Sequence, residues 1–434
     1  MQSVLKCIDC GAEYPLDRLV YTCVTCGGLL DVIHDLDALR GRVTRDLFDA
    51  RLGALESPYR SGVWRFKELV YPDIADDLII SRPEGNTNLY HVPDLAEWAG
   101  LKHLWLKHEG ENPTGSFKDR GMTGGVSQAR RLGMNRVACA STGNTSASLA
   151  SYAARGGMQA IVFFQEGQVA LGKLAQAVAY GATCIQIPGD FDVAMRLVRQ
   201  VAESLGIYLL NSVNPFRLEG QKTIVFEMLQ QLRWEVPDWI VVPGGNLGNS
   251  SAFAKGLMEL RELGLIDRLP RLAIVQAEGA NPLYRGYRSG FSVHERVKAK
   301  TLATAIKIGD PVSYDKAVRA LHWTNGVVEQ VSDQEILDAK ARIDASGIGC
   351  EPASACALAG ARKLAEAGII RPLERVVGVL TGHVLKDPGL IVDYHTNRIE
   401  GIHATYANPL LRVEPTLEAV QAILAEAESA GQQH

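Results

Sequence analysis

The stretch Asn112-Pro-Thr-Gly-Ser-Phe-Lys-Asp-Arg-Gly121 lies between an apolar run and a segment in which apolar residues recur at helical spacing. The apolar run, residues 104–106, indicates a strand, and the helical spacing is set by Val126, Ala129 and Leu132. Ser116, with Asp119 three residues later, predicts an N-terminal capping box. Lys118 therefore falls in the first turn of a helix.

The first turn of a helix is an unfavourable place for a cation, because the helix N-terminus already carries partial positive charge. A lysine there is shifted toward its neutral, nucleophilic form. The alternative is an ordinary exposed lysine on a helix that begins at this point. The stretch by itself leaves both interpretations open, and the rest of the chain decides between them.

Size and composition indicate a multidomain enzyme. The chain has 434 residues, a formal net charge of −4, 47% hydrophobic residues and 22% charged residues. Two or three domains are expected at this length. Without a strongly basic block, a nucleic-acid partner is not expected. No apolar run approaches the length of a membrane span, and the first residues lack the features of a signal peptide, so we expect no membrane role and a cytoplasmic location.

Residues 1–35 form a candidate metal-binding module. Half of the eight cysteines are arranged as two Cys-x-x-Cys pairs: Cys7, Cys10, Cys23 and Cys26. This pattern predicts a closed, structural zinc site of the zinc-ribbon kind. The alternatives are a module that keeps its shape without metal and a pair of disulfides, which a cytoplasmic location disfavours. The other four cysteines are expected to be small apolar residues of the core: Cys139, Cys184, Cys350 and Cys356.

From about residue 104 apolar runs alternate with helical segments. Expected strands cover residues 136–140, 160–164, 183–187, 239–242, 272–275 and 376–380, and expected helices include 191–205 and 352–367. Continuous apolar strands that alternate with helices predict parallel sheets covered on both faces. Ligands bind such sheets at the loops beyond the C-terminal strand ends. A final amphipathic helix is expected after residue 409, with an apolar stripe of Leu417, Val420, Ile423 and Leu424.

Three polar loops follow expected strands. Residues 141–148 combine hydroxyl groups with Asn144, which can donate to a phenolate-like oxygen. Residues 243–250 form a glycine-rich turn that opens a helix, as in a phosphate cradle; an ordinary glycine-rich turn is the alternative. Residues 381–387 begin with Thr381, which can hydrogen-bond a ring nitrogen without charging it, whereas His383 is expected to be structural or solvated. A reactive lysine, a phosphate cradle, an amide and a hydroxyl together point to pyridoxal phosphate.

With these motifs the chain resembles the fold-type II pyridoxal-phosphate enzymes and, within them, the threonine synthase family. The matching segments are 112–121, 141–148, 244–249, 351–354 and 381–387, together with 58–89 and 211–222. The cysteine module is similar to that of the longer threonine synthases. One departure is Val384, which stands where the family loop usually has a second glycine and bears on the backbone geometry of that loop.

The resemblance implies a fold and a set of cofactor contacts. The architecture would be tryptophan synthase β-like, with two doubly wound α/β domains: a large cofactor domain (36–128 and 232–408) and a small domain (129–231), besides the cysteine module and a tail (409–434). Lys118 would carry the cofactor covalently, Asn144 would contact the ring hydroxyl and Thr381 would face the ring nitrogen. The cofactor phosphate would lie in a cradle formed by Gly245, Asn246, Leu247, Gly248 and Asn249.

The implied reaction converts O-phospho-L-homoserine and water into L-threonine and phosphate, with Lys118 as the proton carrier. Candidate contacts of the substrate, chiefly of its phosphate, are Thr114, Ser116, Ser141, Thr142, Thr145, Asn214 and Arg217. The alternatives are a related enzyme acting on phosphoserine (cysteate synthase-like), a threonine dehydratase, and a non-catalytic metal-binding scaffold. By analogy with other cofactor enzymes, a homodimer is expected.

Overall fold

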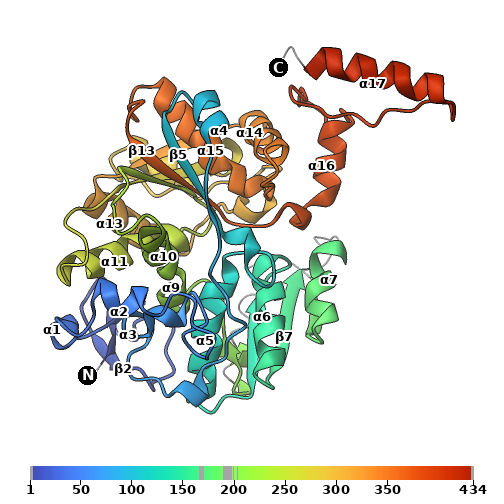
Figure 1. The fold of residues 1–434 in the computed structure, drawn as a ribbon. Helices are drawn as coiled ribbons and strands as arrows, with labels where there is room; N and C mark the ends of the chain where they lie inside the picture. The colour runs from blue at the N-terminus through green and yellow to red at the C-terminus, as the bar shows by residue number, and fades with distance from the viewer. Residues whose placement is uncertain (1–2, 166–170, 189–197, 199, 203, 432–434) are drawn as a thin grey trace. The chain divides into compact units, whose positions relative to one another are not determined.

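The computed structural model describes residues 3–165, 171–188, 198, 200–202 and 204–431. The chain divides into two compact units, Met1–Asp387 and Pro388–His434. The first unit contains three sheets, and its helices pack on both faces of the two larger ones (Figure 1).

The largest sheet has six strands in the order β12-β11-β10-β13-β5-β4. All neighbours are parallel except the edge strand β4, which runs antiparallel to β5. Its strands are β4 (Leu89–His91), β5 (His103–His108), β10 (Trp239–Pro243), β11 (Arg271–Ala277), β12 (Val327–Val331) and β13 (Arg375–Leu380).

The second sheet has four parallel strands in the order β8-β7-β6-β9. They are β6 (Arg136–Ala140), β7 (Gln159–Gln165), β8 (Thr183–Ile187) and β9 (Tyr208–Leu209). The third sheet is antiparallel, has the order β2-β1-β3 and belongs to the cysteine module. Its strands are β1 (Val4–Cys7), β2 (Glu13–Pro15) and β3 (Leu30–Ile33).

Helices connect and cover these strands. The α-helices are α1 (Leu36–Leu39), α2 (Arg45–Asp49), α3 (Lys67–Val70), α4 (Pro93–Trp98), α5 (Lys118–Arg131), α6 (Asn144–Arg155), α7 (Leu171–Ala179), α9 (Pro215–Gln221), α10 (Thr223–Gln231), α11 (Gly248–Glu262), α12 (Pro282–Arg288), α13 (Tyr314–Thr324), α14 (Asp333–Ala345), α15 (Pro352–Glu366), α16 (Pro388–His395) and α17 (Leu417–Gly431). The short 3-10 helices are η1 (Trp64–Phe66), η2 (Asp76–Leu78), η3 (Glu109–Glu111), η4 (Glu278–Ala280), η5 (Thr304–Ile306) and η6 (Val384–Lys386).

The position of β10 in the middle of its sheet explains why its sequence is apolar throughout. All five of its residues are buried. Ile240 and Val242 pack into the cluster that includes α10, α11 and the cysteine module, whereas Trp239 and Val241 pack into the cluster that includes α4, α14 and α15. A strand covered on both faces has no solvent side for polar residues, which explains its unbroken apolar run.

The expected strands are present to within two residues at each end, and the expected helix 352–367 corresponds to α15. Sequence reasoning missed β4, β9 and β12 as strands of the two larger sheets. Strand β12 has two adjacent half-buried polar residues, Glu329 and Gln330, between buried valines and so lacks an unbroken apolar run. The expected helix 191–205 lies largely outside the described residues. Three of the four scattered cysteines are buried as expected, and Cys184 is partly exposed.

The second unit contains α16 and α17. Helix α17 covers the expected C-terminal helix, and its stripe residues Leu417, Val420 and Leu424 are exposed. Within the described residues, the helices are all too short or too polar to serve as a membrane span.

Candidate active site

The loop that leads into Lys118 lies against the loop that begins at Thr381. The backbone N–H of Phe117 donates to the carbonyl of Thr381 at 3.0 Å, and that of His383 donates to the carbonyl of Gly115 at 2.9 Å. Strands β5 and β13 are parallel neighbours, so the loops after their C-terminal ends meet at one sheet edge. Two segments about 260 residues apart are thereby brought together.

The capping box predicted at Ser116 is wrong. Helix α5 begins at Lys118 with Phe117 as its N-cap, and no side chain caps it. The carboxylate of Asp119 instead accepts hydrogen bonds from the backbone N–H and the hydroxyl of Thr114, both at 2.6 Å, and from the hydroxyl of Ser148 at 2.5 Å. The buried hydroxyl of Ser116 has no hydrogen-bond partner among the described residues.

Lys118 has the depressed pKa that a nucleophilic amine needs. Burial, and next the nearby guanidinium of Arg217, lowers the pKa of Lys118 from 10.5 to about 7. The residue keeps some exposed surface, and its amine lies 4.3 Å from the centre of the Phe117 ring. The sequence argument relied on the helix N-terminus, whereas desolvation is the main cause in the structure.

Arg217 is a buried cation without an acidic partner. It lies on α9, and Nη1 donates to the carbonyl of Leu210 at 3.0 Å while Nε has no hydrogen-bond partner in the part of the chain that the structure describes. Burial lowers its pKa to about 10. A buried guanidinium is costly unless an anion pairs with it. Among the described residues no carboxylate does so, which leaves this cation available to an anionic ligand.

Glycines hold α5 and α9 close together. A Cβ at Gly220 of α9 would lie 1.7 Å from the carbonyl oxygen of Arg120, and one at Gly121 of α5 would lie 2.9 Å from the carbonyl oxygen of Arg217. No side chain fits between the two backbones at these points. The close approach sets the distance between the helix ends that carry Lys118 and Arg217.

The glycine-rich turn after β10 fits a phosphate group. A Cβ at Gly245 would lie 3.2 Å from the Cα of Ile306, and Leu247 adopts a left-handed backbone conformation with φ of 64°. Helix α11 begins at Gly248, and within the described ranges the buried side-chain oxygens of Asn249 and Ser250 have no hydrogen-bond partner. The hydroxyl of Ser250 and the backbone N–H groups at this helix N-terminus can donate to an anion, and the residues present fit the phosphate of pyridoxal phosphate.

Asn144 and Thr381, expected to contact the cofactor ring, meet at Glu351. The amide Nδ2 of Asn144 donates to Oε2 of this carboxylate at 2.9 Å, and the hydroxyl of Thr381 donates to Oε1 at 3.2 Å. The hydroxyl of Ser354 accepts from the backbone N–H of Thr381 at 2.8 Å. Burial raises the pKa of Glu351. Sequence reasoning had not assigned Glu351 a role, although the residue opens the Glu-Pro-Ala-Ser segment before α15.

The remaining candidate contacts differ in their freedom to bind. Ser141, Thr142 and Thr145 are partly exposed at the start of α6. The hydroxyl of Thr114 already donates to Asp119. Asn214 is fully buried and caps α9, accepting from the N–H of Phe216 at 3.1 Å and donating to the carbonyl of Leu209 at 2.9 Å. Its amide is therefore committed to the fold.

Lys386 is a second cation that sequence reasoning passed over. Its amine donates to the carbonyl of Thr114 and to Oε1 of Gln176 on α7, both at 2.5 Å. It thus connects the loop after β13 to the loop of Lys118 and to a helix beside the four-stranded sheet. In the same loop Val384 begins η6 and packs against Gly349, so its side chain is accommodated without a left-handed backbone.

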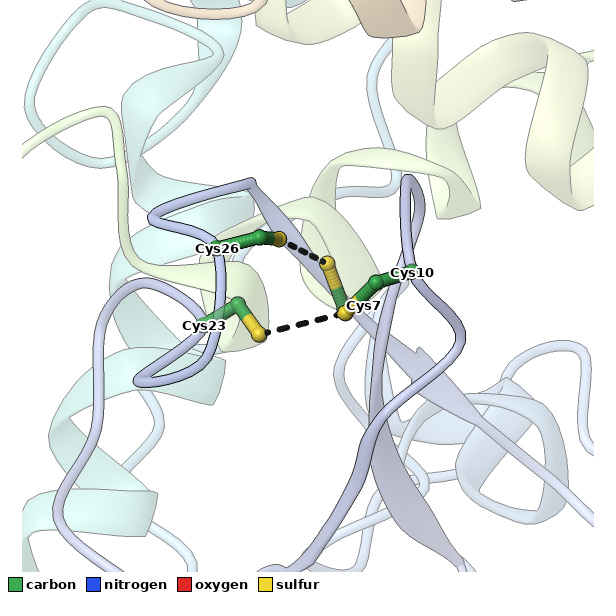
Figure 2. Close-up of side chains that lie close together, drawn as sticks. All are labelled: Cys7, Cys10, Cys23 and Cys26. Carbon is green, nitrogen blue, oxygen red and sulfur yellow. Dashed lines mark hydrogen bonds between the residues drawn. The ribbon is translucent and has the colours of Figure 1, made fainter.

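The four N-terminal cysteines form one cluster (Figure 2). Their sulfur atoms all lie within 4.8 Å of one another, with 3.5 Å between Cys7 and Cys26 and between Cys10 and Cys23. The thiols are free, which excludes the disulfide alternative in this structure. Four sulfur ligands facing one point could hold a zinc ion in a closed, structural site.

Comparisons with known proteins agree with this arrangement. A family model described as "Pyridoxal-phosphate dependent enzyme" matches residues 80–382, which include Lys118, the turn after β10 and Thr381. Maize serine racemase superposes with a TM-score of 0.63 at 19% identity, covering 77% of this chain and 96% of that chain. Tomato threonine deaminase isoform 2 superposes with a TM-score of 0.61 at 20% identity, covering 71% of this chain and 86% of that chain. At such identities the superpositions show the fold alone.

Curated relatives are more similar. The threonine synthase of Methanocaldococcus jannaschii is 49% identical over 88% of this chain and 93% of its own length. The threonine synthase of Methanosarcina acetivorans is 49% identical over 90% of this chain and 93% of its own length. Threonine synthase 2 of Arabidopsis thaliana, a chloroplastic protein, is 46% identical over 95% of this chain and 82% of its own length. The chain therefore belongs to the pyridoxal-phosphate-dependent enzymes and, among them, to the threonine synthase family.

Proposed function

We propose that this chain is a pyridoxal-phosphate-dependent threonine synthase that converts O-phospho-L-homoserine and water into L-threonine and phosphate. Curated threonine synthases that are 44–49% identical over most of the chain support the activity. The observation that carries the choice of substrate is Arg217, a buried guanidinium without an acidic partner whose charge acts on Lys118. A substrate phosphate would supply the missing anion.

Each residue of the site has a proposed part. Pyridoxal phosphate, when bound, supplies an electron sink that stabilises negative charge on the substrate carbons. Lys118 holds the cofactor and, when released, moves protons at Cα and Cβ of the substrate; an amine with a pKa of about 7 can accept and return a proton near neutral pH. Thr381 would hydrogen-bond the ring nitrogen of the cofactor, Asn144 would hydrogen-bond its ring hydroxyl, and residues 245–249 would hold its phosphate.

A second anion pocket is proposed for the substrate phosphate. Arg217 supplies the charge, and the unpartnered hydroxyl of Ser116 supplies a donor. The partly exposed hydroxyls at 141, 142 and 145 stand at the start of α6 and complete the proposed pocket. Thr114 and Asn214 support this pocket through their backbone positions, because their side chains are engaged elsewhere. When phosphate leaves from Cγ, Arg217 neutralises its charge.

The rival enzymes differ in what they require at Arg217. A threonine dehydratase acts on an amino acid without a phosphate and has no use for a buried, unpaired guanidinium. A cysteate synthase-like enzyme on phosphoserine would use the cation, and only its products separate it. The test is incubation with O-phospho-L-homoserine: threonine and phosphate formed together support the proposal, whereas ammonia release or turnover of phosphoserine with sulfite contradicts it. A scaffold protein would give no turnover.

The proposal also covers the oligomeric state, the cellular location and the domain division of the protein. We infer a homodimer by analogy with other cofactor enzymes, a cytoplasmic location compatible with the free thiols, and a division into the domains 1–35, 36–128 with 232–408, 129–231 and the tail 409–434. The separation of the four-stranded from the six-stranded sheet supports the two central domains. Sedimentation equilibrium tests the dimer, and limited proteolysis tests the domain boundaries.

A further inference from the structure

A buried cluster of charges joins the cysteine module to two helices of the site. Glu219 lies on α9 and Lys222 is the C-cap residue that follows it, Lys255 and Glu259 come from α11, and His34 follows β3 of the module. The amine of Lys222 lies 2.5 Å from Glu219 and 2.6 Å from Glu259, and that of Lys255 lies 2.8 Å from Glu219 and 2.6 Å from Glu259. All five residues are buried.

His34 is the module's contribution to this cluster. Its Nε2 lies 2.9 Å from Oε2 of Glu219, and its Nδ1 lies 2.9 Å from the hydroxyl of Ser3, so both ring nitrogens are used. Burial, and next the charge of Lys222, lowers the pKa of His34, which keeps the ring neutral. The carboxylates of Glu219 and Glu259 are paired with the ammonium groups of Lys222 and Lys255. The cluster therefore serves as a fixed connection and not as a cation site.

Strand β3 makes a second connection, to α13. Asp31 lies 2.8 Å from the amine of Lys316, and the same amine donates to the carbonyl of Leu30 at 2.6 Å. Leu30 pairs with Cys7 across the β1–β3 ladder. Cys7, one of the four proposed zinc ligands, therefore lies on the strand next to the one that carries the buried Asp31–Lys316 ion pair. Lys316, together with Arg319, lowers the pKa of Asp31 to about 2 against the effect of burial, so the carboxylate stays charged.

Two further contacts reach elements around the site. The side-chain amide of Gln128 on α5 donates to the carbonyl of Leu16 at 2.6 Å, and the backbone N–H of Leu209 in β9 donates to the hydroxyl of Tyr21 at 2.7 Å. The apolar core is also continuous. Cys7 and Cys23 belong to the same buried cluster as Leu218 of α9 and Phe253 of α11.

The helices held by the module carry the site at their N-terminal ends. Helix α5 begins with Lys118, α9 carries Arg217 in its first turn, and α11 begins in the turn proposed to hold the cofactor phosphate. Glu219 is two residues from Arg217, and Lys255 is two helical turns beyond Gly248. A shift of the module against these helices would move the groups that bind both anions.

We propose that the four-cysteine module is a clamp on α9 and α11, that His34 is its positioning residue, and that zinc at the cysteines and pyridoxal phosphate at the start of α11 bind cooperatively. This goes beyond the assigned reaction and holds whichever phospho-amino acid is the substrate. Coupling between two sites is reciprocal, so each ligand must tighten the binding of the other by the same factor.

The first test uses the whole, wild-type chain. The dissociation constant of pyridoxal phosphate is measured by absorbance with zinc present and after chelation, and the zinc affinity is measured with and without pyridoxal phosphate. We expect both constants to weaken by the same factor, roughly 5–150-fold, with the circular dichroism spectrum retained. Equal constants with and without the partner ligand would overturn the proposal, and so would a protein that binds no zinc with all four cysteines intact.

The second test isolates His34. In His34→Leu zinc still binds, but we expect the coupling factor to fall toward one, and His34→Gln, which keeps a donor, to recover part of it. Glu13→Gln breaks an exposed ion pair on the outer face of the same module and should leave the coupling unchanged. Ile336→Val, in the opposite core cluster, controls for lost stability. Full coupling in His34→Leu, or a loss of coupling in Ile336→Val equal to that in His34→Leu, would refute the role of His34.

Should His34→Leu fail to fold, the reciprocal measurement on the wild-type chain still decides the proposal. The milder Asp31→Asn then tests the second connection. It keeps the shape of the side chain and removes the charge that pairs with Lys316. A reduced coupling factor in Asp31→Asn supports the clamp, and an unchanged factor contradicts the part assigned to β3.

Discussion

Asn144 and Glu351, 207 residues apart in the chain, are joined by a hydrogen bond of 2.9 Å between the amide Nδ2 and the carboxylate Oε2. Asn144 opens α6 beside the four-stranded sheet, and Glu351 precedes α15 on the six-stranded sheet. Because Thr381 also donates to Glu351, one buried carboxylate holds both side chains proposed to contact the cofactor ring. Glu351 therefore orients the two ring contacts.

Replacing Glu351 tests this arrangement. Glu351→Ala leaves the half-buried amide of Asn144 and the buried hydroxyl of Thr381 without this acceptor, and we expect the free energy of unfolding of the cofactor-free protein to fall by about 1–3 kcal/mol. Glu351→Gln keeps an acceptor oxygen and should lose less. Urea denaturation measures both, and the absorbance maximum of bound pyridoxal phosphate should move in each variant. An unshifted maximum with unchanged stability would remove Glu351 from the site.

The pKa of Lys118 predicts a pH dependence of cofactor capture. Only the neutral amine attacks the aldehyde of pyridoxal phosphate, and the amine is neutral above its pKa, which is about 7. The capture rate in cofactor-free protein should rise with pH, with a midpoint near 7, and level off above it. Arg217→Met removes a neighbouring positive charge that lowers this pKa, so its midpoint should lie at higher pH. A midpoint near 10 in the wild-type chain would contradict the prediction.

We expect Arg217 to strengthen substrate binding without stabilising the folded protein. In Arg217→Met we expect KM for O-phospho-L-homoserine to rise by roughly 10–150-fold, the worth of a charged hydrogen bond, while bound cofactor still absorbs. Removing an unpaired buried charge should leave the melting temperature unchanged or higher. Arg217→Lys keeps a charge without the fork geometry and should fall between the two. An unchanged KM in Arg217→Met would sink the assignment of the substrate pocket.

The contact of α5 with α9 is sensitive to one added methyl group. Gly220→Ala places a Cβ 1.7 Å from the carbonyl oxygen of Arg120. Because this oxygen belongs to the backbone of α5, the clash can be relieved only by moving one helix away from the other. Overpacking of this kind should cost about 3 kcal/mol or more, or prevent folding. Gly389→Ala, which meets nothing within 4 Å, is the matched control and should be neutral. Equal denaturation midpoints for the two variants would contradict the packing argument.

The parallel strands with unbroken apolar runs were predictable from the sequence, because burial on both faces excludes polar residues. The strand β10 is an example: all its residues are buried and its expected ends were correct to one residue. The edge strand β12 was missed, because its half-exposed residues break the apolar run. Local patterns thus recover the central strands of the two larger sheets and miss three of their four edge strands, with β8 as the exception.

Within the site, sequence reasoning succeeded where a motif is contiguous and failed where partners are distant. Lys118 was expected in the first turn of a helix and is the first residue of α5, but the cap at Ser116 was wrong because Asp119 is bound by Thr114 and by Ser148, a residue of another helix. His34 pairs with Glu219 across 185 positions, and no spacing rule reports such a contact. The segment 351–354 was recognised as a motif, yet the role of Glu351 needed the fold.

The central claim is that this chain forms threonine by elimination of phosphate from Cγ followed by addition of water at Cβ. The most direct measurement is turnover of O-phospho-L-homoserine in water enriched in ¹⁸O, with mass spectrometry of both products. We expect equal amounts of threonine and phosphate, with the label in the threonine hydroxyl and none in phosphate, because the carbon–oxygen bond breaks. Labelled phosphate with homoserine, or release of ammonia, would contradict the account.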